Sequence, residues 1–229
     1  MKLNINRPSR KGFTLVELLV VMAIIAVLAS IATPLVLNKT READRTKAVG
    51  HAKQCLLAFT EFQIEEGTRP GQQIVDEGNV DGAAAGNAND CFRQLLQRLV
   101  TVRSEAIFFA PSLISREPDN DIGDSTNDFA EACEKGEVGF MYVDAPRAKD
   151  GAPLMAAPLA DDQGTFDFQK YNGKAVVLKT DGSVESLDID EDSEIVNIKV
   201  GGSDVDMFST ANKTFRDSDP PSFLYPDPR

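Results

Sequence analysis

One apolar run near the N-terminus constrains this chain more than any other feature of its sequence. The run extends from Phe13 to Leu37, and Glu17 is its only charged residue. From Leu18 to Asn38 there are 21 residues without a charge; as a helix they measure about 30 Å, the thickness of a bilayer's hydrocarbon layer. Ahead of the run lie four basic residues and no acidic one: Lys2, Arg7, Arg10 and Lys11. Such a flank stays in the cytoplasm, so the sequence predicts a single span that leaves the cytoplasm C-terminally.

Three ordinary interpretations of this run compete with a more specific one. A cleaved secretory signal fits the basic start, but its apolar region is normally shorter, and Ser30–Ala32 is only a passable cleavage site. A plain single-span anchor fits the length but gives no role to Gly12 or Glu17. A buried helix of a globular core is disfavoured by the length of the run and by its basic flank.

Glu17 discriminates among these interpretations. A carboxylate inside hydrocarbon costs several kcal/mol unless it is paired or neutralised. The apolar run contains no Lys or Arg, so the partner must come from elsewhere. A new α-amino group, made by cutting the chain just before Phe13, would supply a positive charge at the same depth.

The segment Lys11–Leu18, KGFTLVEL, resembles the class III signal of type IV prepilins and pseudopilins. The resemblance implies that a membrane-bound prepilin peptidase cuts between Gly12 and Phe13 and then methylates the new N-terminus of Phe13. It also implies that Glu17 pairs with the α-amine of a neighbouring subunit during assembly. Pro34 stands where this family often has a helix-bending proline.

On this resemblance we expect a structural filament subunit and not an enzyme, most specifically a pseudopilin of a type II secretion system that acts in protein secretion. A type IV pilin of a surface pilus, used for adhesion, motility or DNA uptake, is the alternative within the same class. The alternative from another class is a secreted or anchored binding domain with an ordinary signal. The sequence offers no catalytic motif, and its one histidine, His51, lies in the segment 38–66, whose pattern predicts a helix.

The resemblance also implies partners and a location. The partners are the prepilin peptidase, other pilin or pseudopilin subunits in a helical filament, and an inner-membrane assembly platform with its ATPase. The chain would lie in the bacterial inner membrane as a single-pass protein with its head outside the cytoplasm, and then in a periplasmic or extracellular filament. Nucleic acid is not expected, because beyond the first 12 residues 20 basic side chains face 36 acidic ones.

Beyond Leu37 the pattern becomes amphipathic and predicts a helix from about Thr14 to Glu66, stopped by Gly67. The apolar positions recur at helical spacing: Val49, Ala52, Leu56, Phe59 and Phe62. Pro34 should bend or locally melt this helix. The fold class expected is α+β, in which the long helix packs on a small antiparallel sheet. The expected parts are a leader (1–12), a membrane and filament-core helix (13–37), an amphipathic stalk (38–66) and a globular head (67–229).

The head is predicted to hold a helix over Cys91–Val102, capped by Asn89 or Asp90, and a short helix that ends at Gly136. Strands are predicted over Val138–Val143, over 195–200, and in a hairpin whose Asp181-Gly182 turn suits type I′. The segment 146–164 is predicted to be loop. The stretch from Tyr171 to Asp181-Gly182 resembles a group of pilin-like proteins with a His, nine residues and then Asp-Gly, with Tyr171 in place of the His.

The three cysteines leave two alternatives. A Cys91–Cys133 disulfide, with Cys55 single, suits an extracytoplasmic domain. Three buried thiols are the other alternative.

An acidic loop holds weak candidates for a calcium site, the only cofactor considered: Asp119, Asp121, Asp124 and Asp128. Major pseudopilins, which this chain resembles, have a calcium-binding C-terminal loop. The spacing here is not that of an EF-hand, and a second acidic run at 188–194 fits equally well. Acidic loops of this kind are usually only solvated.

Overall fold

The computed structural model describes residues 13–72, 74–76, 79–81, 84–124, 129–145, 148–200, 202–209, 214–215 and 221–228. The chain divides into two compact units, Met1–Thr40 and Arg41–Arg229. Two α-helices and one 3-10 helix are described: α1 (Leu15–Glu66), α2 (Ala88–Arg98) and η1 (Glu105–Phe108). The strands are β1 (Ile74–Asp76), β2 (Asn79–Asp81), β3 (Met141–Asp144), β4 (Pro153–Ala157), β5 (Lys174–Lys179), β6 (Val184–Asp188), β7 (Asn197–Val200), β8 (Ser203–Asp206) and β9 (Ser222–Leu224).

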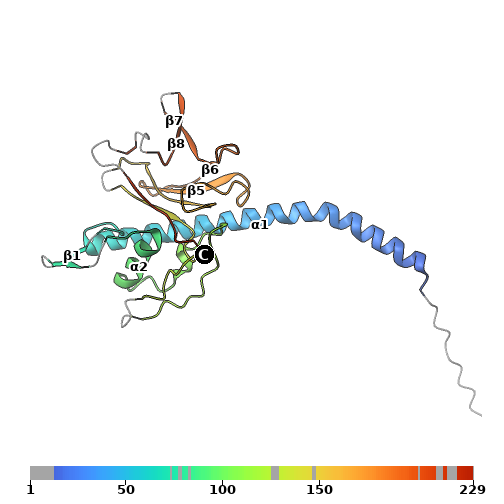
Figure 1. Cartoon of the computed structure of the whole chain (residues 1–229), viewed down its shortest axis with the longest axis horizontal. Helices are drawn as coiled ribbons and strands as arrows, with labels where there is room; N and C mark the ends of the chain where they lie inside the picture. Colours follow the sequence, from blue (N-terminus) through green and yellow to red (C-terminus); the bar gives the residue numbers. More distant parts are fainter. Residues whose placement is uncertain are drawn as a thin grey trace, which may run out of the picture. The chain divides into compact units, whose positions relative to one another are not determined.

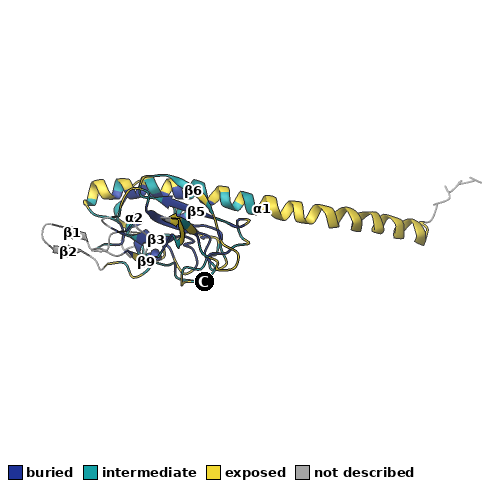
Figure 2. Cartoon of the chain, turned by 90° about the horizontal axis from the view of Figure 1, so that it is seen from above, coloured by how far each residue is buried: buried dark blue, intermediate teal, exposed yellow. Residues whose placement is uncertain are grey.

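The described part of the first unit is the N-terminal portion of α1. Its large apolar side chains from Phe13 to Leu37 are all exposed, by 47% to 81%, as the uniform yellow of this part of α1 shows in Figure 2. Among the described residues, α1 is the one helix long and apolar enough to cross a membrane. The helix is continuous through Pro34, so the predicted local melting does not occur.

In the second unit, α1 supplies one apolar stripe to the core, as the sequence predicts. The buried residues are Ala48, Ala52, Cys55, Ala58, Phe59 and Phe62. The expected stripe members Val49 and Leu56 are partly buried and pack against the same core. The helix ends where predicted, because Gly67 takes the left-handed conformation (φ 68°) that a C-terminal cap needs.

An antiparallel sheet of five strands, in the order β6-β5-β4-β3-β9, forms the centre of the second unit (Figure 1). Its two faces enter different clusters: Val176 and Leu178 of β5 join the cluster built with α1 and α2, and Ala175 and Val177 join the other. This is the period-two alternation of a strand. Two further hairpins, β1-β2 and β7-β8, form separate two-stranded sheets. The α+β prediction of a long helix with an antiparallel sheet is confirmed.

Aromatic rings join α1, α2 and the sheet at the middle of the larger cluster. Phe92 of α2 lies 4.8 Å from Phe108 and 6.1 Å from Phe59 between ring centroids. Phe59 of α1 lies 5.4 Å from Tyr142 of β3. Because each large aromatic buries roughly 150–250 Å², this group holds the amphipathic part of α1 on the sheet.

Several predicted elements differ in the structure. Helix α2 begins at Ala88, because the side chain of Asn87 accepts from the backbone N–H of Asp90 and caps it at 2.8 Å. In place of the short helix before Gly136, the described residues from 129 onward form turns. Strand β4 falls inside the segment 146–164 that we predicted as loop.

The strand over 138–143 begins later than predicted, at Met141. The hairpin β5-β6 is confirmed, but its predicted type I′ turn is wrong, because only Gly182 of the central pair has a positive φ. The bond from Gly182 N to Lys179 O at 3.0 Å instead fits a type I turn followed by a left-handed glycine.

Candidate functional site

The start of α1 is closed by a capping box between Thr14 and Glu17. The hydroxyl of Thr14 accepts from the backbone N–H of Glu17 at 3.2 Å. In return, Oε2 of Glu17 accepts from the backbone N–H of Thr14 at 2.9 Å and from its hydroxyl at 2.7 Å. The Thr-x-x-Glu spacing satisfies amide donors that a helix start leaves without partners. Glu17 is thereby fixed in one orientation at the edge of the apolar run.

The backbone N–H and the hydroxyl of Thr14 both donate to the same oxygen of Glu17, Oε2. A carboxylate has about four acceptor positions. The side chain therefore keeps capacity for a further donor, such as an ammonium group. Phe13, the residue expected to carry that group after cleavage, is 78% exposed at the same end of α1. Gly12, the other half of the expected cleavage site, lies outside the described residues.

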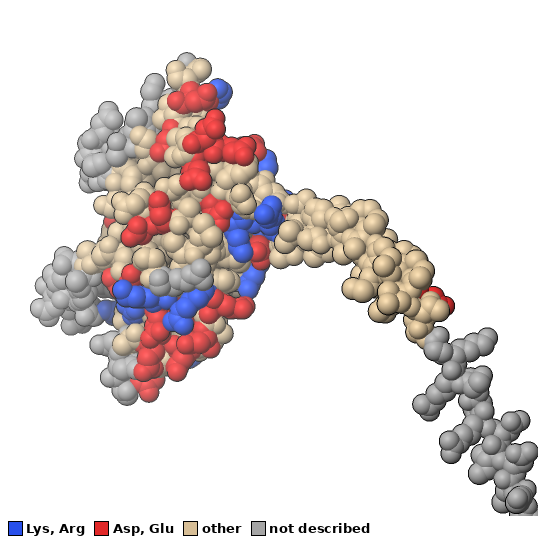
Figure 3. Space-filling model, turned by 45° about the vertical axis from the view of Figure 1, so that its right-hand side comes forward, with Lys and Arg blue, Asp and Glu red and all other residues tan. Residues whose placement is uncertain are grey.

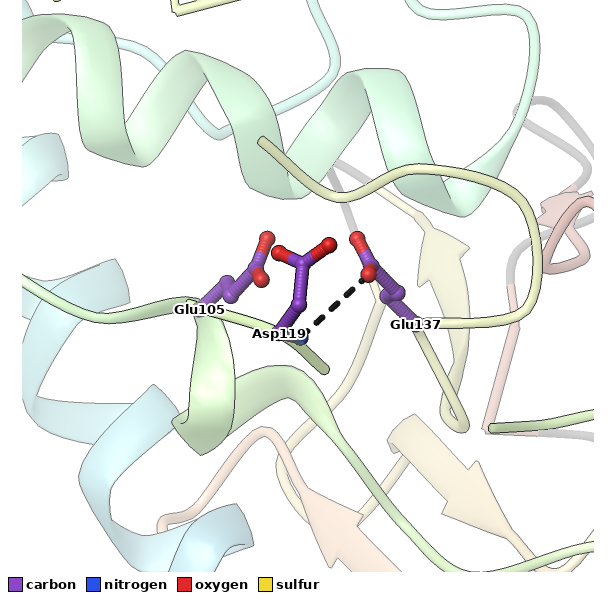
Figure 4. Close-up of side chains that lie close together, drawn as sticks. All are labelled: Glu105, Asp119 and Glu137. Carbon is purple, nitrogen blue, oxygen red and sulfur yellow. Dashed lines mark hydrogen bonds between the residues drawn. The ribbon is translucent and has the colours of Figure 1, made fainter. Parts of the chain in front are cut away.

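A second group of functional side chains lies in the head, where three carboxylates converge. One oxygen from each of Glu105, Asp119 and Glu137 lies within 4.8 Å of the other two (Figure 4). Glu105 and Glu137 are each only 1% exposed. Burial raises the pKa of Glu105, as do the nearby carboxylates of Glu137 and Asp119, although the N–H groups of Cys133 and Asn120 oppose the shift. We refer to these three residues as the carboxylate cluster.

Two kinds of donor stabilise the carboxylate cluster. Backbone N–H groups bond to Glu105 from Cys133 at 2.7 Å and from Asn120 at 3.0 Å. The guanidinium of Arg116 lies 3.1 Å from Oε1 of Glu137. With one guanidinium against three carboxylates, an ionised cluster has a net charge of −2, which a hard divalent cation would balance.

Of the three predicted calcium candidates that the structure describes, one joins this cluster. Asp119 does. Asp121 is exposed, and its N–H donates to Asp119 Oδ1 at 2.8 Å. Asp124 is also exposed, and Asp128 lies outside the described residues. Sequence reasoning missed Glu105 and Glu137, because they come from η1 and from a distant turn and share no spacing with Asp119.

The second acidic run does not form such a group among the described residues. Asp188 forms an ion pair with Lys174 at 2.5 Å. Asp190 accepts from the N–H groups of Asp192 and Ser193 at 3.2 and 2.9 Å. These carboxylates complete a hairpin and a turn.

All three cysteines are free and buried in the structure, so it does not contain the Cys91–Cys133 disulfide and agrees with the second alternative. The Sγ of Cys55 donates to the carbonyl of Ile107 at 3.2 Å. Burial raises the pKa of each thiol well above its ordinary value. Because the thiolate is the reactive species, all three should be inert in the folded chain.

Thiol counting tests this arrangement. In the native chain we expect no reaction with iodoacetamide over minutes at pH 7.5, and in denaturant without reductant we expect three modified cysteines by intact mass. A count of one in denaturant would instead show that two of the three cysteines form a disulfide, and peptide mapping of the modified cysteine would show whether the pair is Cys91 and Cys133. A reduced and denatured sample, in which all three must react, is the control.

His51 and Tyr171 both have structural positions. His51 is half-buried instead of solvated, and its Nδ1 lies 2.7 Å from the carbonyl oxygen of Phe109. Tyr171 is fully buried, and its hydroxyl finds no hydrogen-bond partner among the described residues. The position that holds a His in the resembling group therefore serves here as part of the apolar core.

Comparison with known proteins identifies the class of the N-terminal segment. Residues 7–33 match the family model described as the prokaryotic N-terminal methylation motif. A fimbrial protein of Neisseria meningitidis serogroup B is 39% identical over 62 residues, which cover 27% of this chain and 36% of the relative. A type IV major pilin protein PilE1 of Neisseria gonorrhoeae is 33% identical over 81 residues, which cover 35% of this chain and 46% of the relative.

These matches make the chain type IV pilin-like, as the resemblance of Lys11–Leu18 indicated. It spans less than half the length of these two curated relatives. The relatives are structural pilins and not enzymes, which agrees with the expectation that this chain is not an enzyme. No solved structure matches the chain.

Proposed function

We propose that this chain is a structural subunit of a type IV pilus-like filament, made as a membrane-inserted precursor and cut between Gly12 and Phe13. The observation that carries the proposal is the match of residues 7–33 to the methylation motif. The motif ends within the exposed apolar part of α1, and near the start of this helix the carboxylate of Glu17 is hydrogen-bonded to Thr14. A helix that exposes apolar side chains all round its described length is expected to lie in lipid or among helices of its own kind.

In this proposal the helices exchange one apolar environment for another as they leave the bilayer and bundle. That exchange does little by itself to fix the position of one helix along its neighbour. The pairing of Glu17 with the α-amine of Phe13 on a neighbouring subunit supplies register, since a charge pair in a dry setting is intolerant of misplacement. Repetition of one head-to-tail contact then gives an open helical filament.

The proposed partners are the prepilin peptidase, further subunits, and an inner-membrane platform with its ATPase. The proposed location is the inner membrane with the head outside the cytoplasm, and then the filament. The described face of the second unit is rich in acidic side chains, whereas the described helix of the first unit is almost free of charge (Figure 3). This contrast suits a filament with an apolar centre and an acidic surface.

The finer assignment has two versions. From the sequence we favour a type II secretion pseudopilin. The relatives that the chain matches are named as pilins, so the comparisons support a surface pilin equally well. Deletion in the host separates them: loss of secreted folded proteins would support the pseudopilin, and loss of surface pili with normal secretion would support the pilin.

The test of the filament proposal is the intact mass and N-terminal sequence of the protein extracted from its host's membrane. The expected chain begins at Phe13 and carries one additional methyl group. A chain that begins near Thr33, or that keeps Met1, would overturn the proposal and leave a secreted or anchored domain.

We further propose calcium as a ligand of the carboxylate cluster, at Glu105, Asp119 and Glu137. The support is the convergence of three oxygen ligands with net charge −2, the ligand type that calcium prefers. A cation there would tie η1 to the turn around Glu137 and stabilise the head without taking part in any reaction.

Addition of calcium to the full chain in detergent is therefore expected to raise the Tm. At 100 times the Kd the gain is about 2.7 kcal/mol, or roughly 5–10 °C for a chain of this size. Asp119→Asn should abolish the shift, and the neighbouring Asp121→Asn is the matched control that should keep it. Because the pKa of Glu105 is raised, protons should displace calcium at a higher pH than at an ordinary glutamate. No shift in the wild type would refute the site.

A further inference from the structure

Two arginines stand at the N-terminal end of the stripe that α1 contributes to the core. Buried residues of this stripe recur at spacings of three and four between Ala48 and Phe62. The same spacing, continued towards the N-terminus, reaches Arg45 and then Arg41. Residues at these spacings share one face of a helix, so both arginines lie on the face of α1 that is buried farther along. Both are half-buried, and we refer to them as the arginine pair.

Neither member of the arginine pair forms an ion pair with a carboxylate in the part of the chain that the structure describes. The charges around them are paired elsewhere: Asp44 lies 3.0 Å from Lys170. Lys47 lies 3.5 Å from Glu117. Two like charges four residues apart on a helix repel each other. The chain has 36 acidic side chains against 24 basic ones, so two adjacent arginines without an acidic partner are not explained by the stability of the subunit.

The arginine pair follows closely on the uncharged run in the sequence. The run ends at Asn38, and α1 is continuous from Leu15 to Glu66. At 1.5 Å per residue, Arg41 and Arg45 come about 4.5 and 10 Å after Asn38 along the helix. The polar layer on each side of a bilayer's hydrocarbon is roughly 5–8 Å thick. When residues 18–38 span the hydrocarbon, the two guanidinium groups are therefore within reach of lipid headgroups.

We propose that the arginine pair binds the phosphate of an anionic lipid at the outer face of the membrane. Guanidinium groups bind phosphate through two parallel N–H···O bonds, which makes arginine well suited to this ligand. Residues four apart on a helix have Cβ atoms about 5–6 Å apart, so both side chains can reach one phosphate. The proposal rests on the membrane-inserted precursor proposed above, and adds a ligand that the precursor holds before assembly and releases on leaving the bilayer.

Two features favour a lipid over an acidic protein surface as the occupant. The first is the position of the arginine pair, only three and seven residues beyond the last residue of the uncharged run. Basic residues directly beside a membrane span are attracted to anionic lipid. The second is that both arginines are half-buried on the core-facing side of α1, which leaves access for a small headgroup but little for another folded head. Figure 3 shows Lys and Arg side chains gathered beside α1 on a face of the second unit that is otherwise rich in acidic side chains.

The test is titration of phosphatidylglycerol into the full chain in neutral detergent, with bound lipid counted by native mass spectrometry. Each basic side chain near an anionic surface increases binding by roughly fivefold, so Arg41→Gln combined with Arg45→Gln should weaken the tightest site by at least about tenfold. The matched control combines Lys53→Gln with Arg103→Gln. It removes two charges that are exposed elsewhere on the second unit, and should bind as the wild type does. The basic leader is the same in all three chains, so the difference reports the arginine pair alone.

The double variant should keep the wild-type Tm in detergent, because it removes a repulsion and no ion pair. Phosphatidylcholine should bind at least about tenfold more weakly than phosphatidylglycerol, since its headgroup has no net charge, and excess inorganic phosphate should not displace the lipid.

Three results would overturn the lipid site. The first is equal affinity of the wild type and the double variant for phosphatidylglycerol. The second is displacement of the lipid by inorganic phosphate, which would show a site for a small free anion. The third is unchanged lipid binding together with loss of filaments by the double variant in the host, which would assign the arginine pair to a carboxylate of another subunit.

The lipid site and the filament function can fail separately. A chain that keeps Met1 and forms no filament still contains the span and the arginine pair, so the lipid titration decides the site while the filament function falls. A chain that begins near Thr33 has lost the span, and would overturn both.

Discussion

Replacement of Glu17 by alanine is expected to abolish filament assembly while leaving membrane insertion and removal of the leader intact. Insertion depends on the apolar run, which the change makes more apolar, and cleavage depends on the residues around Gly12. Assembly loses one member of a charge pair that is proposed to form in a dry helix bundle. Removal of one partner from such a pair costs about 3–5 kcal/mol, so assembled subunits should fall by a factor of at least about 100.

The measurement is the ratio of sheared filament to membrane-bound subunit, together with the intact mass of the membrane form. Two further variants separate charge from capping. Glu17→Gln keeps an acceptor for the N–H of Thr14 but removes the charge, and should fail to assemble. Thr14→Val removes the hydroxyl that bonds to Oε2 of Glu17 at 2.7 Å but leaves the carboxylate, so its defect should be milder. Normal filaments from Glu17→Gln would refute the charge-pair mechanism.

Gly139→Ala is expected to prevent the head from folding. A Cβ at Gly139 would lie 2.0 Å from the carbonyl oxygen and 2.5 Å from the nitrogen of Ala110, and backbone atoms cannot move aside as a flexible side chain can. The N–H of Gly139 also donates to the carbonyl of Phe108 at 3.1 Å, which fixes the two segments together. We expect a loss of more than about 3 kcal/mol, from overpacking at the upper end of its range.

Circular dichroism and limited proteolysis of the full chain in detergent would measure this effect. Gly86→Ala is the matched control, because its added Cβ would come no closer than 3.8 Å to a neighbouring side chain. A Gly139→Ala variant with the wild-type Tm would show that the segments around Ala110 and Gly139 are farther apart than described.

The elements that could be predicted from the sequence are those with local signals. Helix α1 has a periodic apolar pattern and a glycine stop at Gly67, and the β5-β6 hairpin has its Asp181-Gly182 turn. Strand β4 has no such signal. All of its residues are buried, because it lies in the middle of a sheet covered on both faces, so no alternation of polar and apolar residues marks it.

The same distinction applies to the candidate sites. Glu17 could be recognised because a carboxylate in an apolar run is conspicuous, and its capping partner Thr14 is only three residues away. The carboxylate cluster could not be recognised from the sequence, because nothing near Glu105 or Glu137 in the sequence distinguishes them from glutamates on the surface. Only the tertiary fold, which buries both beside Asp119, distinguishes them from the neighbouring exposed Asp121.

The position of β9 has a consequence for the order of events during export. Strand β3 pairs on one side with β4, which follows it closely, and on the other with β9, through Tyr142 opposite Leu224. A non-local pairing forms only once both strands are present. With the head outside the cytoplasm, as proposed above, the sheet would stay one strand short until Leu224 has crossed the membrane, and the head would acquire its full resistance to protease only after that.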